Sequence, residues 1–76
     1  SEFHHGVDIA APEGTGIYPA KGGEVVFSGY RKGYGNIVEV DHGNGLVTRY
    51  AHNRVNRVSA GNRVDADTVI AEVGST

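Results

Sequence analysis

The chain has 76 residues, a formal net charge of −2 and no cysteine, so it can form one small domain with a modest core and no disulfide bonds. The seven basic residues are scattered from Lys21 to Arg63, and nothing in the charge distribution points to nucleic acid. No apolar run approaches the roughly 20 residues of a membrane span, and the opening residues lack a signal-peptide pattern.

The first segment with a chemical pattern runs from His4 to Asp8. Its β-branched residues and Gly6 favour an extended backbone, which places the side chains of His4 and Asp8 on the same side. An imidazole and a carboxylate that converge there are ligands that Zn²⁺ accepts. The alternative is a surface histidine, together with an aspartate bonded to the amides of the next turn. Residues 1–3 are either an added junction or native lead-in.

Twelve glycines separate short β-branched runs, a pattern typical of short strands joined by tight turns. Residues 25–28 and 37–40 are expected to be strands. Residues 46–52 resume directly after Asn44-Gly45, a strong hairpin signal because both positions tolerate positive φ. The sequence therefore predicts one antiparallel hairpin over residues 37–52.

The C-terminal third carries weaker patterns. Residues 54–59 alternate imperfectly, so an irregular or edge segment is expected there. A short extended piece over 62–64 and a strand over 69–73 follow, each next to glycine. No helix is expected, and the elements together predict an all-β fold, an antiparallel sheet or small open barrel.

The remaining histidines differ in the roles that their positions predict. His52 ends a predicted strand, where alternation would put Tyr50 and Thr48 on its face. It could act as a general base or stabilise an oxyanion, or equally be a half-buried histidine bonded to a carbonyl. His42 lies in the turn cluster and is expected to bond locally to the backbone. His5 should point away from the possible metal site, and neither of these two is a favoured ligand.

Aromatic side chains offer a possible binding surface for a sugar or peptide, although such residues more often build the core or wall of a small β-domain. The aromatic residues considered are Phe3, Phe27, Tyr30, Tyr34 and Tyr50. Tyr34, Asn36 and Tyr50 are the candidate substrate contacts.

Four blocks of sequence, in order, resemble the lysostaphin-like (LytM-type) zinc endopeptidases of peptidoglycan. H-x-G-x-D alone is a weak pattern, but the ordered set is specific, and the resemblance extends from His4 to the end of the chain. The blocks are His4-His5-Gly6-Val7-Asp8, Gly33-Tyr34-Gly35-Asn36, Tyr50-Ala51-His52 and Gly74-Ser75-Thr76. Residues 58–76 also resemble the half-barrel shared with lipoyl-type domains.

The resemblance implies a Zn²⁺ ion held by His4, Asp8 and the second histidine of a later H-x-H. It implies that His52 orients water and stabilises the oxyanion. The H-x-H is absent from these residues and would follow soon after Gly74-Ser75-Thr76. Residues 1–76 are therefore expected to form a partial domain, incomplete at the C-terminus, with little activity unless another segment or chain supplies the third ligand.

The resemblance also implies a peptidoglycan peptide as substrate and a periplasmic, cell-surface or secreted location. A competing interpretation is a non-catalytic module that binds the wall or activates another wall hydrolase. The joint presence of His4, Asp8 and His52 argues against it. A lipoyl or biotin carrier half-domain is rejected, because the turn over residues 65–67 contains no lysine.

Overall fold

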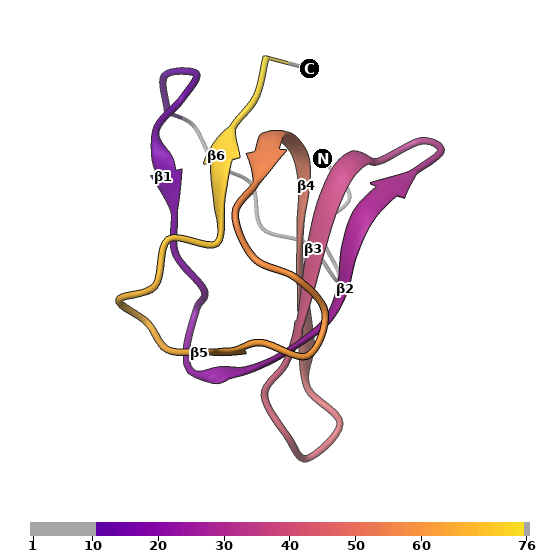
Figure 1. Cartoon of the computed structure of the whole chain (residues 1–76), viewed down its shortest axis with the longest axis vertical. Helices are drawn as coiled ribbons and strands as arrows, with labels where there is room; N and C mark the ends of the chain where they lie inside the picture. The colour runs from indigo at the N-terminus through magenta and orange to yellow at the C-terminus, as the bar shows by residue number, and fades with distance from the viewer. Residues whose placement is uncertain (1–10, 76) are drawn as a thin grey trace.

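A computed structural model describes residues 11–75, which form six strands and no helix (Figure 1). This confirms the expected all-β fold. Among these residues, no helix is long and apolar enough to cross a membrane. The strands are β1 (Gly16–Ile17), β2 (Gly23–Arg31), β3 (Gly35–Asp41), β4 (Val47–Asn56), β5 (Arg63–Val64) and β6 (Ala71–Val73).

The strands form one antiparallel sheet in the order β1-β6-β4-β3-β2-β5. The long strands β2, β3 and β4 make a central meander, and the short strands flank it. The sheet curls into a half-barrel (Figure 1), with the β3–β4 turn at one end. The β2–β3 turn and the ends of β4 and β6 lie at the opposite end.

The predicted hairpin over residues 37–52 is confirmed. Asp41 pairs with Val47, and the N–H of Leu46 donates to the carbonyl of Gly43 at 3.0 Å. Asn44 and Gly45 have φ values of 55° and 80°, as a type I′ turn requires. The local sequence signal therefore set both the position of this turn and the pairing of the strands around it.

The expectation for residues 54–59 is partly wrong. β4 continues to Asn56, where Val55 and Asn56 pair with β6, so residues 54–56 belong to a strand, whereas residues 57–59 lie outside any strand. A register shift between Asn53 and Val55 explains the imperfect alternation, because the bulge changes the phase of the strand. β6 covers Ala71–Val73 rather than the whole of residues 69–73.

The core contains aliphatic residues from β1, β2, β3, β5 and β6, whereas β4 contributes Tyr50. Along β3, Val38 and Val40 belong to this cluster, whereas Ile37 is fully buried outside it. Alternation explains this division, because Ile37 lies on the other face of the strand. The buried cluster is Ile17, Val25, Val38, Val40, Tyr50, Val64, Ile70, Ala71 and Val73.

Glu39 occupies the outer face of β3 and is 7% exposed. Its carboxylate pairs with Arg31 of β2 and, at 3.0 Å, with Arg49 of β4. The Arg31 guanidinium also lies 3.7 Å from the ring centroid of Phe27. Since a buried carboxylate requires such partners, this cluster ties the three central strands together and engages the charge of Arg31.

Candidate active site around His52

The two predicted metal ligands, His4 and Asp8, lie outside the described residues, as does His5. Within residues 11–75, no group of three or more His, Cys, Asp or Glu side chains is arranged to hold a metal ion. Of the residues predicted to bind metal or take part in catalysis, His52 is the one that lies within residues 11–75.

A β-bulge in β4 presents His52. Asn36 pairs with Asn53 and Val38 with Tyr50, so the single residue Ile37 faces two residues of β4. His52 takes a φ of 60° at this bulge, a left-handed conformation that costs a non-glycine residue about 1–2 kcal/mol. The expected alternation holds for Thr48 and Tyr50, whose hydroxyls lie 2.7 Å apart. The bulge interrupts it before His52, which is exposed to solvent.

The backbone of His52 is held from two sides. Its N–H donates to the carbonyl of Tyr34 at 2.8 Å, and a Cβ on Gly35 would lie 3.8 Å from the His52 Cα. On the other side, a Cβ on Gly74 would lie less than 3.0 Å from the His52 carbonyl oxygen and the Arg54 nitrogen. The β2–β3 turn and the end of β6 together fix the catalytic candidate in place.

Three asparagines stabilise β4 beyond the bulge. The Asn36 amide donates to the carbonyls of Asn53 at 3.0 Å and Arg54 at 3.2 Å. Asn53 donates in turn to the Tyr50 carbonyl at 2.8 Å and to Asn56 at 2.9 Å. Asn36 was expected to contact substrate, but its amide nitrogen is engaged with the backbone of β4. This residue therefore acts as a positioning residue for the segment that carries His52.

Tyr50 is a core residue, which corrects its predicted role as a substrate contact. Its side chain is 2% exposed, and its hydroxyl accepts the N–H of Ala20 at 2.8 Å. The same hydroxyl lies within hydrogen-bonding distance of the Thr48 hydroxyl. The Thr48 hydroxyl lies 2.7 Å from Nε2 of His42, and Nδ1 of His42 lies 2.8 Å from the Gly22 carbonyl oxygen. His42 therefore joins distant segments instead of bonding only within its turn, because the pairing of Glu24 with Asp41 brings Gly22 close to it.

Tyr34 remains a candidate substrate contact, since the residue is 49% exposed and its backbone carbonyl is bonded to His52. Sequence reasoning missed the positioning roles of Gly35 and Gly74. The available signal was their place at strand ends, where a glycine often marks close approach of another backbone. Nothing in the sequence identified the backbone that approaches each of them.

The matched family model, Peptidase family M23, covers residues 2–76, so the chain belongs to peptidase family M23. This confirms the lysostaphin-like (LytM-type) resemblance. A crystal structure assigned to peptidase M23 of Pseudomonas aeruginosa superposes with a TM-score of 0.87 and 36% identity, covering 100% of this chain and 34% of that one.

Named relatives fall into more than one functional group. The uncharacterised lipoprotein YgeR of Escherichia coli is 46% identical over 93% of this chain and 29% of its own length. The DD-carboxypeptidase/endopeptidase Mpg of Neisseria meningitidis is 44% identical over 97% of this chain and 17% of its own. The murein hydrolase activator EnvC of Escherichia coli is 39% identical over 93% of this chain and 17% of its own length. The chain thus spans less than a third of each relative's length.

Proposed function

We propose that this domain is the catalytic part of a zinc-dependent endopeptidase that hydrolyses the peptide cross-links of bacterial peptidoglycan. Family membership and the endopeptidase relatives support a peptidase. The observation that carries the proposal is the conformation of His52, an exposed histidine with a φ of 60° at a bulge. Strained residues of this kind cluster at functional sites, because surrounding structure must maintain them.

His4 and Asp8 would hold the metal. An imidazole nitrogen and a carboxylate oxygen suit Zn²⁺, and a catalytic site takes three protein ligands and leaves one position for water. When bound, zinc would supply Lewis acidity toward the scissile carbonyl and lower the pKa of a water molecule. Two of three ligands are present in these 76 residues, so we expect them to bind zinc weakly by themselves.

His52 would serve the reaction directly. From an exposed position its imidazole can accept or donate a proton, or donate a hydrogen bond to the oxygen on which negative charge develops. The Tyr34 carbonyl and the close approach of Gly74 restrict its backbone. Such restriction matters, because a catalytic group contributes most when its geometry is fixed before the reaction.

A non-catalytic activator of another wall hydrolase is the second candidate, favoured by the similarity to EnvC. The two proposals differ in what they require of the chain. An activator needs a docking surface but no ligands and no strained histidine. The presence of His4, Asp8 and His52 in one sequence therefore favours the enzyme.

We further propose a location in the cell envelope, at the periplasmic or external surface. The support is the naming of relatives as lipoproteins, including the NlpD/LppB homologue of Pseudomonas aeruginosa at 42% identity. A peptidoglycan substrate is consistent with that location.

The deciding experiment measures zinc binding and wall hydrolysis in the full-length protein and in residues 1–76. We expect the full-length protein to clear a suspension of purified peptidoglycan, to lose this activity with a chelator and to regain it with zinc. Residues 1–76 should bind zinc weakly until a segment with H-x-H is supplied. Full lytic activity from residues 1–76 alone would contradict the ligand count. Stimulation of a separate hydrolase without zinc-dependent cleavage would favour the activator.

A further inference from the structure

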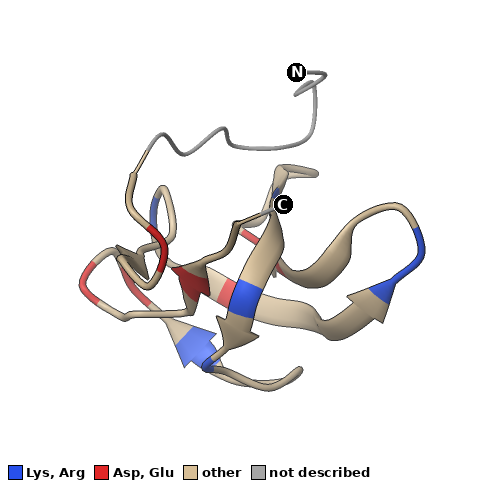
Figure 2. Ribbon diagram, turned by 90° about the horizontal axis from the view of Figure 1, so that it is seen from above, with Lys and Arg blue, Asp and Glu red and all other residues tan. Residues whose placement is uncertain are grey.

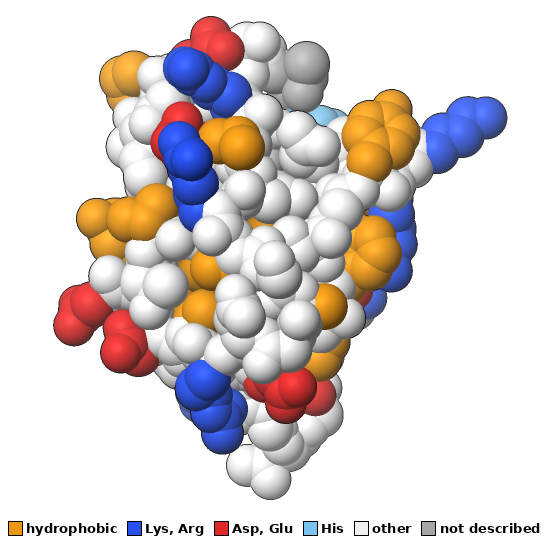
Figure 3. All heavy atoms as spheres, in the orientation of Figure 1, with side chains coloured by type: hydrophobic (Ala, Val, Ile, Leu, Met, Phe, Trp, Pro, Cys, Tyr) orange, Lys and Arg blue, Asp and Glu red, His pale blue; other side chains and the backbone are white. Residues whose placement is uncertain are grey.

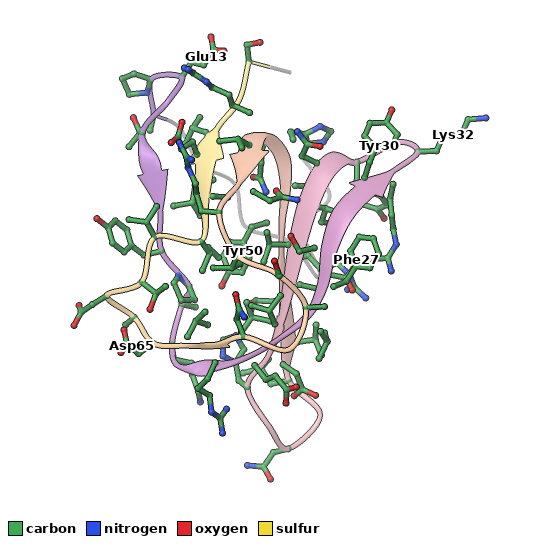
Figure 4. The ribbon with its side chains drawn as sticks, viewed as in Figure 1. Glu13, Phe27, Tyr30, Lys32, Tyr50 and Asp65 are labelled. Atoms are coloured by element: carbon green, nitrogen blue, oxygen red, sulfur yellow. The ribbon has the colours of Figure 1, made fainter. Side chains whose placement is uncertain are left out.

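The tip of the β2–β3 hairpin, residues 30–34, is exposed, aromatic and basic. Tyr30 is 72% exposed and Tyr34 49% exposed, and Lys32 between them is also exposed. Figures 3 and 4 show hydrophobic surface at this end of the molecule, with the labelled side chain of Lys32 projecting beyond Tyr30. The tip therefore offers an aromatic face and a cation side by side.

The charge of Lys32 has no ion-pair partner among the described residues. Arg31 pairs with Glu39, whereas Lys32 makes no ion pair with any residue in the range 11–75. No acidic residue occurs between Gly29 and Ile37. Figure 2 shows no acidic residue on the projecting turn between β2 and β3. A ligand carboxylate would find a free ammonium group here.

The tip is fixed and adjoins His52. The N–H of Tyr34 donates to the Arg31 carbonyl at 3.0 Å, and Gly33 has a φ of 89°, which defines a tight turn with glycine at the position that needs positive φ. The Tyr34 carbonyl then accepts the N–H of His52. The turn that displays Lys32 is thus the same turn that positions His52.

The register sets the distance between the tip and the catalytic candidate. Tyr30 pairs with Asn36, and Asn36 pairs with Asn53, the residue after His52. Two strand spacings separate Tyr30 from Asn53, roughly 10 Å. An extended peptide covers this distance in about three residues. A peptide that crosses β3 from Asn53, the residue next to His52, would therefore reach Tyr30 after about three residues.

We propose that the β2–β3 tip binds the substrate beside the scissile bond, with Tyr30 packing against the peptide and Lys32 binding a carboxylate on it. This assignment rests on the proposed function. It specifies an acidic peptide as the preferred substrate and makes Tyr30 and Lys32 determinants of specificity. Tyr30 supplies a flat surface of low conformational entropy, and Lys32 selects for negative charge.

The test compares Lys32→Gln and Tyr30→Ala in the full-length zinc-loaded protein. The substrates are a soluble cross-linked peptide with free carboxylates and the same peptide with these groups amidated. Lys32→Gln should raise KM about fivefold on the free carboxylate only. Tyr30→Ala should raise KM roughly tenfold on both peptides. In both variants kcat should stay within about twofold of wild type, because neither side chain takes part in the chemical step.

Matched controls are Lys21→Gln, at the opposite end of β2, and Tyr18→Ala, which is 52% exposed beside β1. Both controls should leave KM unchanged. The proposal would be overturned if Lys32→Gln had the same KM as wild type on the free-carboxylate peptide. It would also be overturned if the variant raised KM equally on the amidated peptide. A Tyr30→Ala defect confined to glycan-bearing substrates would overturn it as well, because the contact would then be with sugar.

Failure of the proposed function gives a different result. A zinc-loaded wild-type protein that hydrolyses neither peptide would refute the endopeptidase. Calorimetric binding of the free-carboxylate peptide to wild type and to Lys32→Gln would still decide the role of the tip. Weaker binding by the variant would support the contact, and equal binding would overturn it.

Discussion

The hairpin of β3 and β4 contains two histidines, His42 and His52, which differ in exposure and in backbone conformation. At one end, both ring nitrogens of His42 lie within hydrogen-bonding distance of the chain's own Gly22 carbonyl and Thr48 hydroxyl. The positive φ values nearby fall on Gly43, Asn44 and Gly45, which adopt them readily. At the other end, His52 is exposed and itself carries a positive φ.

The contrast shows where this small fold tolerates strain. In the turn that follows His42, each position with a positive φ is occupied by glycine or asparagine, which adopt this conformation readily. Around His52 a histidine takes a conformation suited to glycine, and the neighbouring Asn53 keeps a buried side-chain oxygen without a hydrogen-bond partner in the described structure. Unsatisfied and strained groups are expected where function demands them. This contrast supports a structural role for His42 and the proposed catalytic role of His52.

The largest effect should come from removing a proposed metal ligand. His4→Ala or Asp8→Ala in the full-length protein should abolish both zinc binding and wall hydrolysis, since the metal would supply the central chemistry. Zinc stoichiometry by atomic absorption and peptidoglycan turbidity measure the two losses together. His42→Ala is the histidine control, and zinc loss in that variant would refute its purely structural role.

Replacing His52, the proposed catalytic histidine, should lower the rate of hydrolysis without a comparable loss of stability. His52→Asn should lower kcat about 10²- to 10³-fold while zinc remains bound, as expected for loss of one acid–base or oxyanion group. Asparagine tolerates the left-handed conformation, so the unfolding free energy should change by less than about 0.5 kcal/mol. Chemical denaturation and steady-state kinetics on the same samples test this. A fully active His52→Asn enzyme would remove His52 from the mechanism.

Two glycines provide a matched pair for the positioning of His52. A Cβ added at Gly23 or at Gly74 would come within 3.0 Å of a backbone carbonyl oxygen, that of Asp41 or of His52 respectively. Each change to alanine should destabilise the fold by about 1–3 kcal/mol. Only Gly74→Ala should also lower kcat of the remaining folded protein, since it displaces the backbone of His52. Equal kcat values in the two variants would contradict the positioning role of Gly74.

The smallest effects belong to the structural histidine and its partners. His42→Ala should cost about 1–3 kcal/mol, and Tyr50→Phe about 1 kcal/mol, because each leaves polar partners unpaired. For a chain of this size, the melting temperature should fall by about 4–8 °C per kcal/mol. Differential scanning calorimetry measures the change in melting temperature, and kcat of the folded fraction should match that of wild type. A drop in kcat would extend the catalytic role to the opposite end of the hairpin.

Local patterns predicted much of the fold. Asn44-Gly45 placed the β3–β4 hairpin, and glycine-bounded β-branched runs indicated β2, β3 and part of β6. The two-residue β1 was not predicted, because so short a strand exists only through its pairing with β6. The continuation of β4 past His52 was missed because a bulge shifts the alternation on which the prediction relied.

The sequence by itself determined the all-β class, the main hairpin and the ordered motifs that resemble a peptidase family, since these depend on turn propensities and on the order and types of side chain present. Only the tertiary structure decided which of the predicted site residues are exposed and which are buried or bonded to the backbone. It placed Tyr50 in the core, engaged Asn36 with the backbone of β4 and turned His52 to the surface. The reason is that burial and bulge geometry arise from partners distant in sequence, such as Ala20 for Tyr50 and Gly74 for His52.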